Sequence, residues 1–273
     1  VRENPYREWL HGNRFGFRKI KQLSNDPLYG KEELLKRMRA FGYTSETLEF
    51  MLFPMVHDLR DPLGSMGNDT VLASLSDNHR LIYDYFKQRF AQVSNPSIDS
   101  IREKIVMSLE CYIGPEGNLL EPGEKHANRI LVENPILTNT AMYALKHLNY
   151  LNHRSKVIDI TYTKEVGLNE KIDEICRAAE ESVDNGIGFI VLSDRGMDES
   201  RTPISALMAC GAVHHHLVKS AKRSKAAIVV ETGEAREVHH FCLLFGYGAD
   251  AINPYLAYEI LMQAKAENVI KHT

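Results

Sequence analysis

Charged side chains that could take part in binding or catalysis come directly after short apolar runs in the second half of the chain. Asp194 and Arg195 follow the run 188–192, and Glu231 follows the run 226–230. An Asp, an Arg and a Glu that converge could bind a polar metabolite. They could equally neutralise one another in a salt-bridged rim, because the chain has no nucleophile elbow, Walker loop or dinucleotide-binding glycine pattern. We favour the rim and therefore predict no catalytic residue in this chain.

Histidines gather at 214–216 and 239–240, which suggests metal binding at first sight. Consecutive residues on a helix point about 100° apart, so a triplet cannot direct three imidazoles at one ion. The chain also has no His-Glu-x-x-His spacing. We therefore predict structural histidines and no metal site.

Four short apolar runs must position the charged residues. They are rich in Ile and Val and lie at 156–160, 188–192, 226–230 and 249–253. Such runs are typical of strands buried on both faces, and the segments between them are long enough for crossover helices. The pattern predicts an α/β fold, either layered or barrel-like, with about four parallel strands in residues 156–265, in an order that it does not reveal. Because open α/β sheets bind ligands at the carboxyl ends of their strands, the residues just after the runs are the default site.

Helix signals separate the runs. An apolar face over 172–183 ends at Asn185-Gly186, and Thr202-Pro203 is typical of the start of a second helix. Glu234 and Glu237 suit the first turn of a third helix.

Residues 1–155 are predicted to be mainly helical and rich in loops. The expected helices cover 31–40, the residues from Thr44 to just before Pro54, 81–90, 101–112 after a capping box, and 135–150. Residues 61–70 hold glycines and small hydroxyl residues, so this stretch is either a plain surface turn or a loop that approaches a ligand closely.

The composition of the chain argues against some classes of function. The 273 residues carry a formal charge of −3, which gives no electrostatic case for nucleic acid. The basic, aromatic stretch 1–26 fits a linker better than a nucleic-acid surface, since no recognised module accompanies it. Apolar residues are 44% of the chain but never run long enough to cross a bilayer, and no signal peptide is visible. We expect a cytoplasmic protein without a membrane segment, and the start at Val1 suggests an excised domain or a processed product.

The four cysteines, scattered singly among apolar residues, are predicted to be buried thiols.

Several long stretches in one order together resemble a known family. They are 64–70 (GSMGNDT), 85–96, 107–121, 192–196, 211–217 and 231–240. The chain resembles the central domain of the large (alpha) subunit of glutamate synthase, and the resemblance covers nearly all of 1–273.

The resemblance implies a connecting domain between a glutamine amidotransferase domain and an FMN-binding domain of the same polypeptide. The parent enzyme would convert glutamine, 2-oxoglutarate and reductant into two glutamates, with ammonia passing through a tunnel. The family's amidotransferase nucleophile is an N-terminal cysteine, which this chain lacks, and FMN and the iron–sulfur cluster belong to other parts of the enzyme. No cofactor is therefore expected in this fragment, and we predict that the fragment alone is inactive.

Two loops take roles from the resemblance. In the family, the loop that corresponds to Gly64, Ser65, Met66 and Gly67 reaches the FMN and 2-oxoglutarate site of the neighbouring domain. Ser94 and Asn95 correspond to a pair near the mouth of the ammonia tunnel, where Ser in place of Thr keeps the hydroxyl. A tunnel for neutral ammonia needs uncharged walls, and 93–97 carries no charge.

Two other interpretations remain at this stage. The chain could be a free-standing small-molecule binding module that uses Asp194, Arg195 and Glu231, or an independent enzyme with a degenerate barrel. The sequence also leaves open whether a parent enzyme uses ferredoxin or NADPH, and its oligomeric state.

Overall fold

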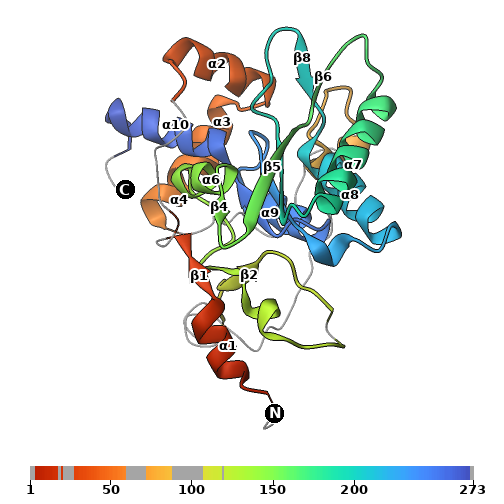
Figure 1. The fold of residues 1–273 in the computed structure, drawn as a ribbon. Helices are drawn as coiled ribbons and strands as arrows, with labels where there is room; N and C mark the ends of the chain where they lie inside the picture. Colours follow the sequence, from red (N-terminus) through yellow and green to blue (C-terminus); the bar gives the residue numbers. More distant parts are fainter. Residues whose placement is uncertain are drawn as a thin grey trace.

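The computed structural model describes residues 4–17, 20, 28–59, 72–87, 107–118 and 120–270. Its central sheet has five strands in the order β10-β9-β7-β5-β4 (Figure 1). They are β4 (Asn149–Tyr150), β5 (His153–Asp159), β7 (Phe189–Ser193), β9 (Ala227–Glu231) and β10 (Ala251–Asn253). The last four are parallel, and β4 is antiparallel to β5. The four apolar runs are therefore the four predicted parallel strands, and among the described residues they form an open α/β sheet.

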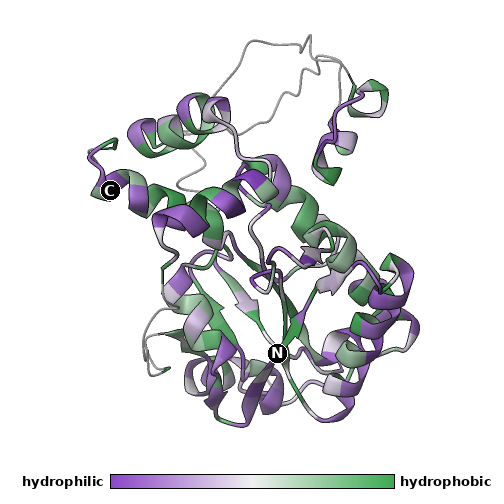
Figure 2. Cartoon of the chain, turned by 90° about the horizontal axis from the view of Figure 1, so that it is seen from above, coloured by the Kyte–Doolittle hydropathy of each residue, from purple (hydrophilic) through white to green (hydrophobic). Residues whose placement is uncertain are grey.

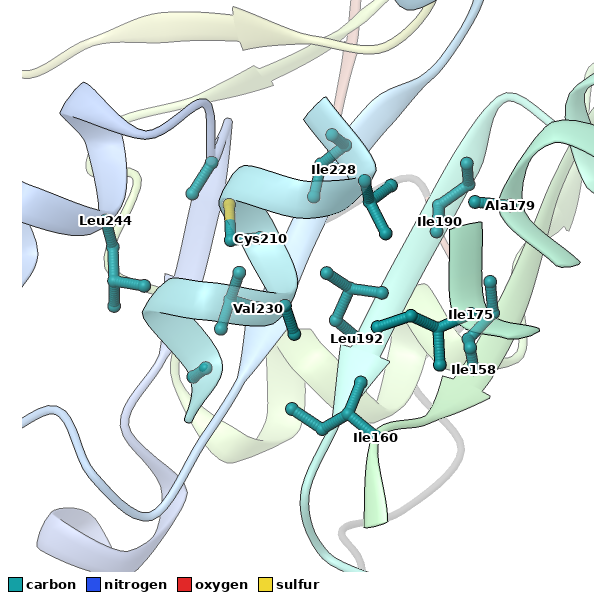
Figure 3. Close-up of a cluster of buried hydrophobic side chains, with 14 of the residues drawn as sticks. Ile158, Ile160, Ile175, Ala179, Ile190, Leu192, Cys210, Ile228, Val230 and Leu244 are labelled. Atoms are coloured by element: carbon teal, nitrogen blue, oxygen red, sulfur yellow. The ribbon is translucent and has the colours of Figure 1, made fainter. Parts of the chain in front are cut away.

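Three helices cover one face of this sheet, namely α7 (Leu168–Asp184), α8 (Ala206–Lys219) and α9 (Val238–Gly246). Each parallel strand pairs with the next one along the chain, so right-handed crossovers place all three helices on the same side. Figure 3 shows the apolar core between these layers, where Leu192 and Val230 of the sheet lie close to Ile175 of α7 and Cys210 of α8. Burial of these side chains is the main force that holds the helices to the sheet.

The opposite face packs on α6 (Asn139–Lys146) and on a small sheet with the order β1-β3-β2. Its strands are β1 (Phe15–Gly16), β2 (Cys111–Ile113) and β3 (Ile130–Val132). Side chains alternate along a strand, so Val191 and Val229 point to this face whereas their neighbours point to the helices. They share a second core with Met142, Leu145 and Ile130.

A third core lies over the carboxyl end of the sheet. It joins α2 (Lys31–Ala40), the π-helix η2 (Leu48–Leu52) and α10 (Tyr255–Ala266), and the short α3 (Ser45–Thr47) leads into η2. Met197, four residues beyond β7, and Tyr255, two residues beyond β10, pack with Leu34 and Phe41 there. Figure 1 shows α2, α3 and α10 at the end of the molecule where β6 (Thr161–Thr163) and β8 (Arg201–Pro203) also lie. The edge that usually binds ligands in an open α/β sheet is thus covered by the chain's own helices.

Short elements complete the described chain. They are α1 (Tyr6–Asn13), α4 (Phe53–Asp58), η3 (Ala73–Leu75), η4 (Ile82–Phe86), η5 (Glu124–Ala127) and η6 (Arg223–Lys225). Figure 2 shows the same arrangement from above, with hydrophobic and hydrophilic residues both present on the helices around the central strands. In the described part of the chain, no helix combines the length and apolar character that crossing a bilayer requires.

Several helix predictions are confirmed. The helices predicted at 31–40 and around 172–183 are α2 and α7, and Gly186 adopts a positive φ of 73° just after α7. The prediction from 135 to 150 is too long, because α6 covers only 139–146. The helix predicted at 81–90 appears in the described residues as the short 3-10 helix η4.

The second helix does not end before Pro54, contrary to the prediction. The helical path continues from α3 through η2 into α4, where Pro54 occupies the first turn. Proline lacks an N–H group and its ring clashes with the carbonyl one turn earlier. The wider π turn just before it accommodates the proline.

Other predicted helix positions are wrong. Tyr112 lies in β2, because antiparallel pairing with Leu131 of β3 competes successfully with the local helical pattern. Thr202-Pro203 belongs to β8, and α8 begins only at Ala206. Glu234 precedes α9, which begins at Val238 with Glu237 as its N-cap residue.

Candidate functional site

Polar residues at the ends of β7 and β9 meet, as predicted from their positions after the apolar runs. Ser193 Oγ donates a hydrogen bond of 2.6 Å to Glu231 Oε2, and Arg195 Nε lies 2.7 Å from Glu231 Oε1. These side chains form the centre of the candidate site. Asn253, at the end of β10, is not part of it, since its amide donates to Leu137 O and Asn139 Oδ1 at the start of α6.

Glu231 is surrounded by cations. Its side chain is 1% exposed, and Lys146 Nζ at the end of α6 lies 3.0 Å from Oε1. Arg195 also bridges to Glu259 Oε1 of α10 at 3.1 Å, with its guanidinium 4.0 Å from the centre of the Tyr255 ring. Burial alone would lower the pKa of Arg195, but the neighbouring Glu231 raises it. Charges that neutralise one another therefore join α6 and α10 to the ends of β7 and β9.

Asp194 has a different environment. It is fully buried, and it accepts hydrogen bonds from Thr232 Oγ1 at 2.6 Å and from the Gly233 amide at about 3 Å. Burial, together with the nearby Glu234, raises the pKa of Asp194 to about 7 even though the hydrogen bonds from Thr232 and Gly233 act to lower it. Asp194 is therefore protonated in a large fraction of molecules near neutral pH.

Glu234 is the second buried carboxyl of this region. Its Oε2 atom accepts from Tyr83 Oη at 3.2 Å, from Ser205 Oγ at 3.0 Å and from the Ala206 amide at 2.9 Å. Burial raises its pKa, and these donors work in the opposite direction. These three partners belong to the chain itself, so this carboxyl ties the start of α8 to η4.

The turn between α2 and α3 packs against Gly233 and Arg236 and covers the site on that side. Tyr43 Oη donates to Gly233 O at 3.1 Å, and a side chain at Gly233 would lie 2.6 Å from the Phe41 ring. Arg236 donates to Phe41 O at 2.9 Å and lies 4.2 Å from the centre of the Tyr43 ring. Only glycine fits at 233, because both the ring and the buried tyrosine are held in place.

A cavity of about 390 Å³ remains beside the charged cluster. It is lined by Lys146, His147, Val157, Asp159, Ser193, Arg195, Gly196 and Glu231. Asp159 in its wall forms an ion pair with Arg201 and accepts a hydrogen bond from Thr161 Oγ1. The charges of the wall thus face partners within the chain, which agrees with the predicted salt-bridged rim.

Four of the five clustered histidines contact groups of the chain itself. His214 Nδ1 accepts from Arg223 Nε at 3.0 Å, and His216 Nε2 lies 2.6 Å from Glu180 of α7. His239 donates to Tyr83 O, and His240 pairs with Glu237. In the ranges that the structure covers, no three His, Cys, Asp or Glu side chains are grouped as metal ligands. The buried-thiol prediction holds for Cys176 and Cys210, whereas Cys111 is half-buried and Cys242 is exposed.

Two predicted sites cannot be placed. The loop of Gly64, Ser65, Met66 and Gly67 lies outside the described residues, as does the pair Ser94 and Asn95. The capping box of Ser100 and Glu103 lies there too.

Sequence reasoning missed several members of the strand-end cluster. Lys146 comes from α6 on one face of the sheet, Glu259 from α10 over its carboxyl end, and Tyr83 from a short 3-10 helix. One signal was available for Glu259, which follows Tyr255 and Leu256 at helical spacing on a face that is otherwise apolar. Such a charge on a buried face needs an ionic partner.

The fold and the site define a class: an open α/β domain whose strand-end charges are paired internally. A family model described as the glutamate synthase central domain matches residues 36–273. The chain belongs to this family.

Curated relatives agree with the family. The NADH glutamate synthase of Schizosaccharomyces pombe is 50% identical over 241 residues, which cover 86% of this chain and 11% of that protein. The large chain of the NADPH glutamate synthase of Bacillus subtilis is 44% identical, covering 96% of this chain and 17% of the relative. A ferredoxin-dependent glutamate synthase of Arabidopsis thaliana, chloroplastic/mitochondrial, is 40% identical over 97% of this chain and 16% of its own length. The chain therefore spans less than a fifth of each of these relatives.

Proposed function

We propose that this chain is the connecting domain of a cytoplasmic glutamate synthase, between the amidotransferase and FMN-binding domains of one polypeptide. It is a single domain over 1–273, with a helical part at 1–155 and a β/α part at 156–265. Its Gly64–Gly67 loop contributes to the FMN and 2-oxoglutarate site, and Ser94 and Asn95 line the ammonia tunnel. The parent reaction converts glutamine, 2-oxoglutarate and reductant into two glutamates.

One observation supports this proposal most strongly. The strand-end carboxylates, which would bind a substrate in an autonomous α/β enzyme, are bonded to the chain's own groups and lie beneath α2 and α10. A sheet whose strand-end charges are paired within the chain can serve as a rigid scaffold, which keeps the elements packed around it at fixed distances. The matched relatives are several times longer than this chain, which leaves room for the domains that carry the chemistry.

The cysteines of this chain do not fit an iron–sulfur cluster. Such clusters need several thiolates around one centre. Cys176 lies on α7, Cys210 on α8 and Cys111 on β2, and the described residues contain no cluster of metal ligands. We therefore propose that an iron–sulfur cluster of the parent enzyme is held by other parts of the polypeptide, and we propose the same for FMN on the basis of the family resemblance.

The proposal is tested in an intact glutamate synthase that carries Met66→Ala and Ser94→Val. We expect a fall in glutamate formed per glutamine hydrolysed, because the first change alters a contact at the flavin site and the second removes a hydroxyl from the tunnel. Both products are measured by chromatography in the same reaction. Met262→Ala, which changes an exposed methionine on α10, is the matched control and should leave the yield unchanged. A normal yield in the double variant would refute the assigned loop roles.

The cavity of about 390 Å³ favours one alternative, a free-standing module that binds a small polar metabolite at Arg195 and Glu231. Calorimetric titration of the isolated chain with 2-oxoglutarate, glutamine and FMN separates the two proposals. We expect no saturable heat with any of the three, because the charged groups already have partners. Saturable binding that disappears in Arg195→Met would establish the alternative.

A further inference from the structure

A second cavity, of about 690 Å³, lies beside the turn between α2 and α3. Its wall comes from four segments that are distant in the sequence: the end of α2 with the turn that follows, α3 with η2, residues 79–87, and residues 236–240 at the start of α9. It shares no lining residue with the cavity beside the strand-end cluster. The two cavities are therefore separate features of the molecule.

Arg236 is a buried cation in the wall of this second cavity. It is 8% exposed, and among the described residues no carboxylate forms an ion pair with it. Arg37 is buried to a similar degree, at 6% exposed, but its Nε atom lies 2.7 Å from Glu33 Oε1. Buried charges in proteins are normally paired. Arg236 thus lacks the counter-ion that the chain provides for Arg37.

The buried carboxyl of Glu234 does not take that place. Its Oε2 atom accepts hydrogen bonds from Tyr83, Ser205 and the amide of Ala206. Arg236 acts to lower the pKa of Glu234, yet burial keeps that pKa above its ordinary value. The Arg236 guanidinium lies near the cavity wall instead, because a side chain at Gly42 in that wall would lie 3.9 Å from its Nη2 atom.

Arg39 and Arg80 add two positive charges to the same wall. Arg39 lies in the last turn of α2, and Arg80 lies two residues before η4. Both are exposed, and neither forms an ion pair within the part of the chain that the structure describes. Three guanidinium groups without carboxylate partners around one cavity attract an acidic group, which they can bind through paired hydrogen bonds.

The carboxylates of the wall do not neutralise these arginines. Asp84 and Glu237 both pair with Lys87, at 3.4 Å and 3.0 Å, and Glu237 also contacts His240. Glu46 lines the cavity too, but it is exposed and forms no ion pair with a described residue. Water screens the charge of such an exposed side chain. The cavity is therefore still short of negative charge at the buried arginine.

An exposed aromatic side chain lies at the edge of the cavity. Phe50 of η2 lines it and is 70% exposed, more than any other aromatic side chain among the described residues. Met51 lies next to it in the wall. Phe, Met and Arg are the residue types that are enriched at protein–protein interfaces, whereas small-molecule sites are mostly apolar and enclosed. The wall therefore suits a protein segment better than a metabolite.

We propose that this cavity is a docking surface for an acidic segment from another domain of the same polypeptide. Carboxylates of that segment pair with Arg39, Arg80 and Arg236, and an apolar side chain of it covers Phe50. The inference rests on the proposed role of the chain as a connecting domain. The matched relatives have most of their length outside the matched region, so such a segment has ample chain from which to come.

The test places a photoreactive side chain at the edge of the cavity in the complete enzyme, as Phe50→p-benzoylphenylalanine. On irradiation this side chain reacts with the group that covers position 50, and mass spectrometry identifies the linked peptide. We expect a peptide from outside 1–273 that contains neighbouring Asp or Glu residues. The matched control is Val218→p-benzoylphenylalanine, at an exposed position of α8 that does not line the cavity. It should not capture the same peptide.

The role of the charges is tested by adding Arg39→Ala and Arg80→Ala to the photoreactive enzyme. We expect the yield of the linked peptide to fall about fivefold, because two ion pairs of the docked segment are lost. Arg236 is left in place because its removal from a buried position would disturb the fold. The control is Lys31→Ala with Lys36→Ala, which removes two cations of the same helix that already pair within the chain. It should leave the yield unchanged.

Three results would overturn the inference about the docking surface. They are links only within 1–273, links to a segment without acidic residues, and no linked peptide at all. An unchanged yield after the loss of both arginines, or an equal fall in the lysine control, would also overturn it. The loop roles are judged separately, by the glutamate yield of Met66→Ala with Ser94→Val. A normal yield there, together with a captured acidic peptide, would refute the loop roles and leave the docking surface in place.

Discussion

Replacing Glu231 with alanine will lower the free energy of unfolding by about 3–5 kcal/mol, the usual cost of removing one member of a buried ion pair. The carboxylate is 1% exposed and is shared by Lys146 and Arg195, whose side chains are 11% and 14% exposed. Without it, the site holds two cations close together in a medium of low polarity. Ser193 also loses the acceptor of its hydrogen bond.

Urea unfolding followed by circular dichroism measures this change. The matched control is Glu199→Ala, since Glu199 pairs with Lys36 while its side chain is 90% exposed. Solvent screens such a pair, so its loss should hardly move the midpoint. Equal midpoints for the two variants would show that Glu231 is not the centre of the cluster. Glu231→Gln should fall in between, because it keeps the shape and removes the charge.

Asp194→Asn will change how stability depends on pH. Burial raises the pKa of Asp194 from its ordinary value of 3.8 to about 7, so the folded chain holds this proton more tightly than the unfolded chain. Its stabilising contribution is therefore fully present below pH 3.8 and is lost as the pH rises to about 7. Since each unit of pKa difference is worth about 1.4 kcal/mol, the total change is on the order of 4 kcal/mol.

The measurement is a series of urea midpoints from acid to neutral pH for both proteins. Asparagine resembles the protonated acid and does not titrate, so the variant should gain stability relative to the original chain as the pH rises. Asp198→Asn is the control with the opposite sign, because the Ser200 hydroxyl that donates to Asp198 lowers the pKa of that carboxyl. Parallel pH curves for Asp194→Asn and the original chain would refute the raised pKa.

The sheet was predictable because its signal is strong and local. The run at 188–192 is apolar on both faces, and the structure buries Phe189, Ile190, Val191 and Leu192 completely. The order of the strands was not predictable, since pairing depends on contacts between distant segments. The same reason explains the error at Tyr112, whose strand forms only because β3 is present to pair with it.

Half of the candidate site followed from the sequence. Asp194, Arg195 and Glu231 come straight after apolar runs, so the carboxyl ends of parallel strands bring them together. Tyr83 and Lys146 could not be predicted, because each joins the site from an element whose packing direction is set by the whole core. Glu234 shows how a local rule fails. Acidic residues are favourable in the first turn of a helix, which is where Glu234 was predicted to lie. Burial and the hydrogen bond from the Tyr83 hydroxyl instead determine its position.

The parallel pairing of β1 with β3 has a consequence for evolution. Phe15 lies opposite Ile130, so the two strands close a single long excursion of the chain that contains both proposed functional loops. The entropy cost of closing such an excursion grows only with the logarithm of its length, and doubling the length costs about 0.6 kcal/mol. A change of chain length at an exposed position of this excursion therefore costs little entropy, whereas Phe41 and Tyr83 inside it are held by packing. The excursion can vary in length between such buried positions while the parallel sheet stays as it is.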